Sequence, residues 1–127
     1  MKYIVKTTKS VDQACADLEQ AVVDNQFGHL CTHDLKATME SKGVDFPHEC
    51  RILEVCNPHK AKAVLMEDMH INMALPCRIS VWEQDGGTLI GTLEPTALLG
   101  MFGDTPTLNQ VAEDVEQTIK TIIDQAK

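Results

Sequence analysis

The segment 51–58, Arg-Ile-Leu-Glu-Val-Cys-Asn-Pro, is the clearest junction between a strand and a helix in the chain. Its first part, up to Cys56, is an apolar run with β-branched residues, which is typical of a strand. Asn57 is a favourable N-cap residue, and Pro58 suits the first helical position, where its missing N–H costs no hydrogen bond. We therefore expect a strand that ends at Cys56 and a helix from Pro58 to about Glu67.

On the N-terminal side of this junction, short strands alternate with amphipathic helices. Residues 2–7 and 29–32 are expected to form two strands. The helix between them begins at Ser10, where Ser-Val-Asp-Gln has the form of a capping box. Its apolar residues recur at steps of three and four and form one stripe: Val11, Ala14, Cys15, Leu18, Ala21 and Val22. A further helix is expected over 33–42, with Leu35 and Met39 facing inward.

On the C-terminal side, the chain is expected to be extended from Ile71, with an interruption at Pro76. Residues 77–83 and 88–93 then predict a hairpin around Asp85-Gly86-Gly87. A short helix is expected over 95–102, and a last helix begins near Thr105. The last helix has one apolar face, formed by Leu108, Val111, Val115, Ile119, Ile122 and Ile123.

The order of these elements predicts an α+β fold. Because the hairpin strands alternate apolar and polar residues, the simplest arrangement is a single sheet of about five strands with helices packed mainly on one face. The chain has 127 residues and a mass of 14.0 kDa, which suits one hydrophobic core. We therefore expect residues 1–127 to form a single domain.

Composition and charge exclude several classes of protein. Hydrophobic residues make up 43% and charged residues 24%, an ordinary globular mixture that argues against a disordered chain. The net charge of −8 repels phosphate backbones and anionic lipids, so neither nucleic acid nor a membrane is an expected partner. The chain has no long apolar run or signal-peptide pattern, and its five cysteines lack a paired spacing. We expect a cytoplasmic protein with reduced thiols.

Cys56 and Cys77 are the candidate catalytic residues. The start of a helix beside Cys56 lowers the pKa of a thiol, whereas burial raises it. Cys77 would lie next to Cys56 if the stretch from Ile71 were aligned with the strand from Cys50, because both pairs are 21 residues apart. The alternative is that both cysteines are small buried side chains at strand ends.

The other cysteines and histidines do not predict a metal site. Only Cys31-x-His33 and His48-x-Cys50 have a strand spacing that places two ligands on one face, and no spacing supplies the remaining ligands that zinc needs. Methionines near His70 could suggest copper, but methionine also fills gaps in cores. The acidic pairs at Glu67-Asp68 and Glu83 to Asp85 are expected on solvated surfaces. We therefore expect no metal and no cofactor.

Two short motifs carry a family resemblance. With Cys56-Asn57-Pro58 and Leu75-Pro76-Cys77, the chain resembles the bacterial and archaeal family called domain of unknown function 302, and the likeness extends through Glu94-Pro95 over nearly the whole chain. The resemblance implies an α+β fold grouped with TATA-box-binding-protein-like sheets, a homodimer and no established activity. Glu94 stands where the family commonly has Asp, which leaves its N-cap role open.

These observations predict a small binding or accessory module without demonstrated catalysis. Asn57 and Pro58 are its candidate ligand-binding residues. A second hypothesis is a thiol or sulfur-handling redox protein, with Cys56 as nucleophile and Cys77 as resolving partner. A third is a purely structural homodimer that associates through the apolar segment 98–102.

Overall fold

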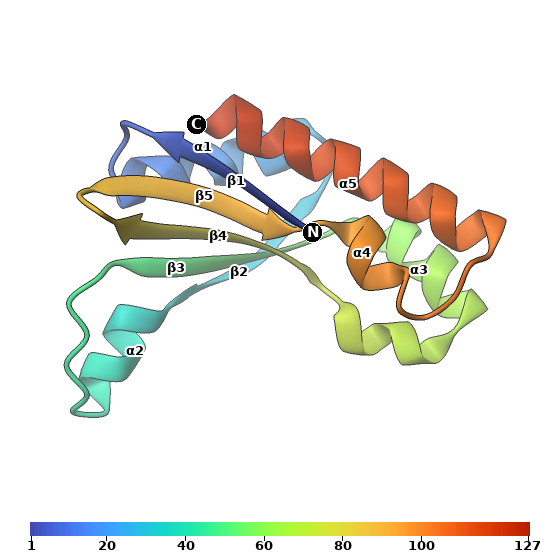
Figure 1. Ribbon diagram of the computed structural model, residues 1–127, viewed down its shortest axis with the longest axis horizontal. Coiled ribbons are helices and arrows are strands. Elements are labelled where there is room, and N and C mark those ends of the chain that lie inside the picture. The colour runs from blue at the N-terminus through green and yellow to red at the C-terminus, as the bar shows by residue number, and fades with distance from the viewer.

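The computed structural model describes residues 1–127 and contains one five-stranded antiparallel sheet in the order β1-β5-β4-β3-β2 (Figure 1). The strands are β1 (Lys2–Thr7), β2 (Gly28–Asp34), β3 (Cys50–Cys56), β4 (Cys77–Gln84) and β5 (Gly87–Leu93). The helices are α1 (Val11–Asp24), α2 (Leu35–Ser41), α3 (Pro58–Glu67), the 3₁₀ helix η1 (Met69–Ala74), α4 (Pro95–Leu99) and α5 (Pro106–Ala126). The expected α+β class is confirmed.

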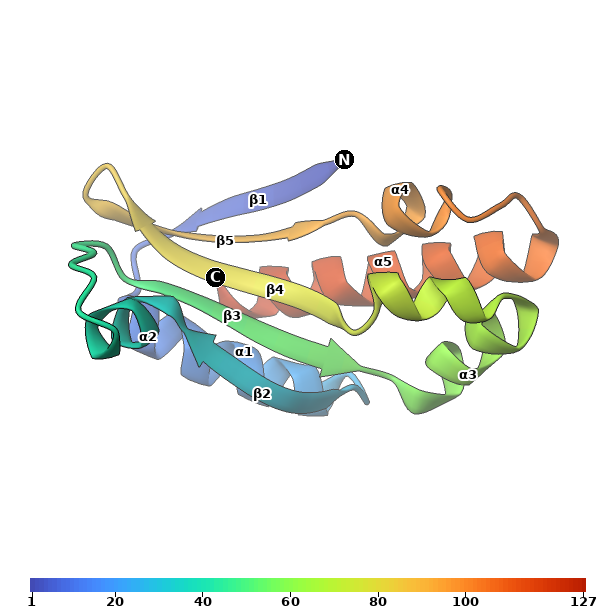
Figure 2. The same cartoon turned by 90° about the horizontal axis from the view of Figure 1, so that it is seen from below.

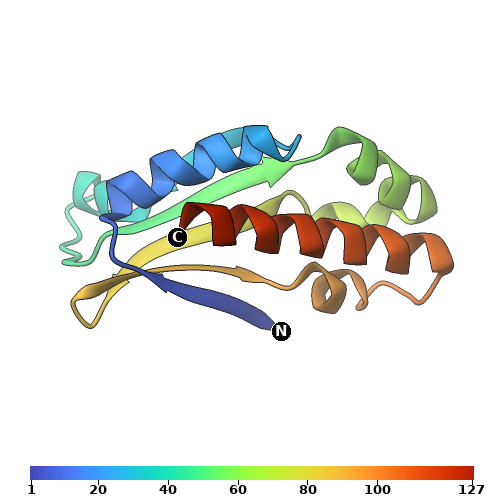
Figure 3. The same cartoon turned by 90° about the horizontal axis from the view of Figure 1, so that it is seen from above.

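The two long helices cover one face of the sheet. Figure 3 shows α1 and α5 side by side across this face, and Figure 2 shows the opposite face without such a layer. The elements α3, η1 and α4 gather beyond one end of the strands, and α2 lies at the other end (Figure 1). We call the face turned away from α1 and α5 the open face. None of the helices combines the length and hydropathy that a membrane crossing requires.

The core lies between the sheet and the two long helices. All the residues expected on the apolar stripe of α1 are buried, and so are all those expected on the apolar face of α5. The strands contribute the buried side chains of Leu53, Val55, Ile79, Val81 and Ile90. The 3.6-residue period of both helices therefore identified their buried faces correctly.

Local signals set most element boundaries. Asn57 Oδ1 accepts hydrogen bonds from the backbone N–H groups of His59 and Lys60, which caps α3 as expected. Ser10 caps α1 through the N–H of Gln13, although the Gln13 side chain donates to Asp17 instead of completing the capping box.

The β4–β5 hairpin closes through Asp85 and Gly86, with φ angles of 52° and 78°. Positive φ at both central positions is typical of a two-residue type I′ turn.

Several sequence predictions were wrong in detail. Ile71 is not extended but fully buried in η1, because Asp68 caps this helix through the N–H of His70. Leu35 and Met39 are only half-buried, since α2 lies at the end of the sheet. β2 runs to Asp34, which then caps α2.

The predicted alignment of Ile71 with Cys50 was also wrong. β3 and β4 are antiparallel, so Cys50 pairs with Trp82, and Cys77 pairs with Val55. The peptide bond between Leu75 and Pro76, just before β4, is cis.

Candidate functional site

An apolar cavity of about 470 Å³ opens on the open face of the sheet. Its floor includes side chains from β1, β3, β4 and β5, among them Ile4, Ile52 and Trp82. Residues at the end of η1, the link to β4 and α4 form its wall, including Leu75 and Leu98. The strand period of two explains the floor, because each second residue of these strands points away from the helical layer.

The charged residues that line this cavity, Lys2 and Arg78, are both basic. They come from β1 and β4, on either side of β5. Ser80 and Thr92 add hydroxyl groups to the lining. In a chain with a net charge of −8, this cavity therefore presents a local surface that suits an anion joined to an apolar body.

Gly91 shapes the floor of the cavity by lacking a side chain. A Cβ atom at this position would lie 3.1 Å from Ile4 Cγ1, 3.1 Å from Trp82 Cη2 and 3.2 Å from the Tyr3 carbonyl oxygen. Such contacts are tighter than ordinary van der Waals contact, so the missing side chain of Gly91 leaves the Ile4 and Trp82 side chains space over β5.

Cys56 and Cys77 both line a second cavity of only about 30 Å³, under α3. This space has room for about one water molecule. Cys77 also lines the large cavity, so it lies between the two. Burial raises the pKa of the Cys56 thiol, and burial followed by the nearby Cys56 raises the pKa of Cys77 to about 11. All five cysteines are free thiols.

Asn57 and Pro58 have structural roles at the start of α3. The Asn57 carboxamide oxygen is engaged by two backbone N–H groups, and Pro58 occupies the first turn of the helix. Asn57 lines the small cavity, and neither residue lines the large one.

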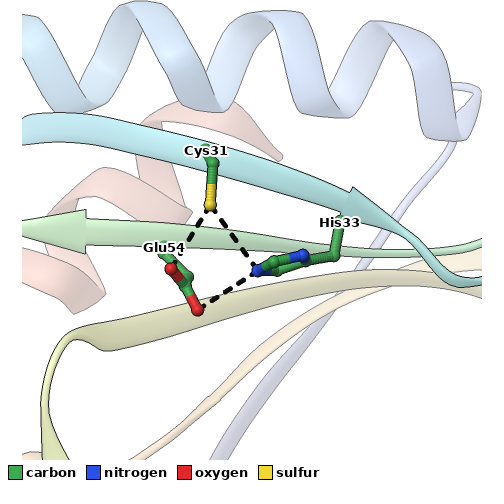
Figure 4. A group of neighbouring side chains, drawn as sticks. All are labelled: Cys31, His33 and Glu54. Carbon is green, nitrogen blue, oxygen red and sulfur yellow. Dashed lines mark hydrogen bonds and ion pairs between the residues drawn. The ribbon is translucent and has the colours of Figure 1, made fainter.

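Three potential metal ligands converge on the open face near the β2 edge. Cys31 and His33 project from β2 and Glu54 projects from β3, toward a common point (Figure 4). Cys31 Sγ lies 3.5 Å from His33 Nε2 and 3.3 Å from Glu54 Oε2, and His33 Nε2 lies 3.2 Å from Glu54 Oε1. We call these three residues the Cys-His-Glu cluster.

A β-bulge at Leu30 creates this cluster. The register passes from His29 opposite Val55 directly to Cys31 opposite Glu54, so Leu30 is an extra residue in β2. If β2 paired with β3 without this bulge, Leu30 would lie opposite Glu54, and Cys31 and His33 would point toward the helical layer. The sequence placed Cys31 and His33 on one face, but it gave no signal for Glu54, because the pairing of β2 with β3 cannot be read from spacing.

Hydrogen bonds within the cluster shift the pKa values of Cys31 and Glu54. The thiol of Cys31 donates to Glu54, and this hydrogen bond, with a smaller effect of desolvation, raises the pKa of Cys31. The same hydrogen bond, with that of His33, lowers the pKa of Glu54, and the charge of Arg78 acts in the same direction. Arg78 is the cross-strand partner of Glu54, so it lies between the cluster and the large cavity.

A family model and solved structures match the chain. The family model described as "Domain of unknown function DUF302" matches residues 3–126. The crystal structure of an uncharacterized conserved DUF302 protein from Bacillus stearothermophilus is similar, with a TM-score of 0.92 and 33% sequence identity over 99% of this chain and 98% of that chain. No curated protein matches the chain.

Proposed function

Since the chain belongs to the DUF302 family, which has no assigned activity, we propose its function from the open face: it is a binding module for a small amphipathic anion. The observation that supports this proposal is the apolar cavity of about 470 Å³ whose charged lining residues are Lys2 and Arg78. The expected ligand has an apolar body of modest size and one carboxylate or similar group.

The dimensions and chemistry of the cavity support this assignment. Binding sites for small molecules commonly have volumes of about 300–1,000 Å³, mostly apolar walls and a few polar groups that orient the ligand. Ile4, Ile52 and Leu98 would contact the apolar body. The Arg78 guanidinium would hold the anionic group through charge-assisted hydrogen bonds, which are stronger than neutral ones.

Trp82 provides a direct measurement of binding. It is the only tryptophan in the chain and it lines the cavity, so its fluorescence reports on occupancy. The first experiment titrates the protein with decanoate, 1-decanol and decylammonium, which share one alkyl chain and differ in charge. We expect decanoate to bind most tightly and decylammonium most weakly.

Three variants test whether the response comes from the cavity. Arg78→Gln should weaken decanoate binding about tenfold, the size expected for loss of one charge-assisted hydrogen bond. Ser80→Phe should block the cavity and abolish the response. Lys62→Gln, an exposed residue of α3 that does not line the cavity, is the matched control for the loss of one positive charge and should bind decanoate normally.

The proposal would be overturned by equal affinities for decanoate and 1-decanol together with unchanged binding by Arg78→Gln. It would also be overturned if Ser80→Phe, with a normal circular dichroism spectrum, still bound decanoate like the unmodified protein.

We also propose that the protein forms a homodimer in the cytoplasm. The family resemblance implies the dimer, and the free thiols are consistent with a reducing compartment. The segment 98–102 offers less apolar surface than expected, because Leu99 is buried and Leu98 lines the cavity. The rim of the cavity is a better candidate surface, since Ile4 and Leu93 are 46% and 48% exposed there. A second copy over this rim would also shield the bound ligand.

Light scattering tests this part of the proposal. We expect a mass of twice 14.0 kDa for the unmodified protein and of 14.0 kDa for Ile4→Lys. Met101→Lys is the matched control, because Met101 is an exposed apolar residue that lies outside the cavity, and it should remain dimeric. A monomeric unmodified protein at micromolar concentration, or a dimeric Ile4→Lys variant, would contradict it.

A further inference from the structure

We propose that the Cys-His-Glu cluster binds one divalent transition-metal ion of the zinc class on the open face. The site is separate from the cavity proposed for the amphipathic anion, and its ligand atoms come from Cys31, His33 and Glu54. All three potential ligand atoms lie within 4.8 Å of one another.

The separations between the ligand atoms fit a metal ion at their centre. Zinc lies 2.0–2.3 Å from sulfur, nitrogen and oxygen ligands, so tetrahedral ligand atoms should be about 3.3–3.6 Å apart. The observed separations are 3.5 Å from Cys31 Sγ to His33 Nε2, 3.3 Å from Cys31 Sγ to Glu54 Oε2 and 3.2 Å from His33 Nε2 to Glu54 Oε1, so the sulfur and the nitrogen approach different oxygens of the same carboxylate. A rotation of the Glu54 carboxylate that brings one of its oxygens toward both the sulfur and the nitrogen would let the three side chains hold one ion.

The donor set selects the class of metal. A thiolate and an imidazole favour zinc and its neighbours over Mg²⁺ and Ca²⁺, which prefer oxygen ligands only. The Cys31 thiol loses its proton to solvent on binding, and the Glu54 carboxylate is already ionised. The two negative charges then balance the charge of a divalent ion, while His33 binds as a neutral imidazole.

The surroundings leave one coordination position free. The cluster supplies three protein ligands, and the His33 side chain is 49% exposed, so solvent can complete the tetrahedron. Three protein ligands with one open position are the arrangement of an accessible metal site, in contrast to the closed four-ligand structural sites.

The β-bulge at Leu30 is a second feature that points to the site. Bulges are frequent next to functional sites, where they redirect a side chain. Here the extra residue directs both Cys31 and His33 to the face that carries Glu54. Leu30 itself remains 58% exposed, so burial of its own side chain does not explain the bulge.

A cluster held together only by hydrogen bonds is the alternative, because Cys31 donates to Glu54 in the absence of any ion. Cobalt distinguishes the two cases, since Co²⁺ occupies zinc sites and gives an intense near-ultraviolet band when a thiolate binds it. The reduced protein is titrated with Co²⁺, followed by Zn²⁺ with a competing chromophoric chelator. We expect a thiolate-to-cobalt band that saturates at one ion per chain and disappears when Zn²⁺ displaces the cobalt.

Single substitutions assign the ligands. Cys31→Ser should abolish the band, and His33→Gln and Glu54→Gln should each weaken Zn²⁺ binding about tenfold or more. The matched controls are Cys50→Ser, His48→Gln and Glu40→Gln, which remove the same residue types outside the cluster and should bind like the unmodified protein. Circular dichroism checks that each variant is folded.

The proposal is overturned if no thiolate band forms at millimolar Co²⁺, or if the band survives in folded Cys31→Ser. It is also overturned if Cys50→Ser loses the band as completely as Cys31→Ser, since another thiol would then be the ligand. These readouts do not depend on any ligand in the apolar cavity.

Discussion

Two opposed influences act on the thiol of Cys56. The residue ends β3 directly before α3, where the free N–H groups of a helix stabilise a thiolate. Pro58 removes one of these donors, and the Asn57 side chain already accepts from two others. Burial therefore dominates, and the pKa of Cys56 lies above its ordinary value. Its partner Cys77 is less acidic still, with a pKa of about 11.

We expect Cys56 and Cys77 to react with iodoacetamide only after the protein is unfolded. At neutral pH a thiol with a pKa of about 11 has a thiolate fraction on the order of 10⁻⁴, and the thiolate is the reactive form. Peptide mapping by mass spectrometry after timed alkylation measures each of the five rates. If Cys56 reacted fastest in the folded protein, burial would not control its reactivity, and the hypothesis of a sulfur-handling nucleophile would gain support.

At the scale of elements, periodic patterns predicted the long helices well. The stripe of α1 and the apolar face of α5 each repeat over several turns, so single exceptions do not obscure the period. Short elements have too few turns to show such a period, so local capping and burial decide their conformation instead. Ile71 was expected in an extended segment, but the cap at Asp68 and a buried position stabilise η1 there.

Contacts between elements were not predictable from the chain alone. Cys31 and His33 were expected to share one face of a strand, and they do. Glu54 joins them only through the β2–β3 register, which in turn depends on the extra residue Leu30. The large cavity was not predictable either, because its lining comes from elements that are far apart in the sequence: β1, β3, β4, β5, η1 and α4.

The helix α5 should contribute strongly to stability. Ile119 is fully buried on its apolar face, so Ile119→Ala should lower the free energy of unfolding by about 2–5 kcal/mol, through lost burial and the cavity that remains. Glu113→Ala is the control on the exposed side of the same helix and should change stability by about 0.5 kcal/mol or less. Urea unfolding measures both. An Ile119→Ala loss as small as that of the control would mean that α5 is not part of the core.

At the scale of the whole molecule, the helical layer provides the core and the open face carries both proposed sites. Arg78 lies between these sites, lining the cavity and facing Glu54 across the strands. If both proposals hold, a metal ion bound to the cluster would neutralise the charge of Glu54. The Arg78 guanidinium would then be attracted less to Glu54 and would bind an anion in the cavity more tightly. Binding of the metal and of the anion would then favour each other, as thermodynamic linkage requires of any such coupling.

Glu94 joins three distant parts of the fold. Its carboxylate lies 2.7 Å from the amino group of Met1 and 2.7 Å from Lys120 Nζ on α5, at the start of α4. It does not cap α4 with its side chain. The hydrogen bond from Lys120, then that from Met1, lowers the pKa of Glu94 from 4.5 to about 2.

Acid should therefore weaken this junction in a defined range of pH. A carboxyl group whose pKa is lowered by folding stabilises the folded state above its unfolded pKa, and this contribution is lost as the pH falls through the folded value. For Glu94 the contribution is complete above about pH 5 and disappears toward about pH 2. Glu94→Gln should thus be less stable than the unmodified protein near neutral pH, and the difference should close on acidification, as measured by urea unfolding across this range.

Glu113→Gln, at an exposed position without an ion pair, controls for the loss of one negative charge and should stay close to the unmodified protein at each pH. A difference for Glu94→Gln that is the same at both ends of the range would show that the substitution acts through packing, because an interaction of the ionised carboxylate has to vanish when the group is protonated.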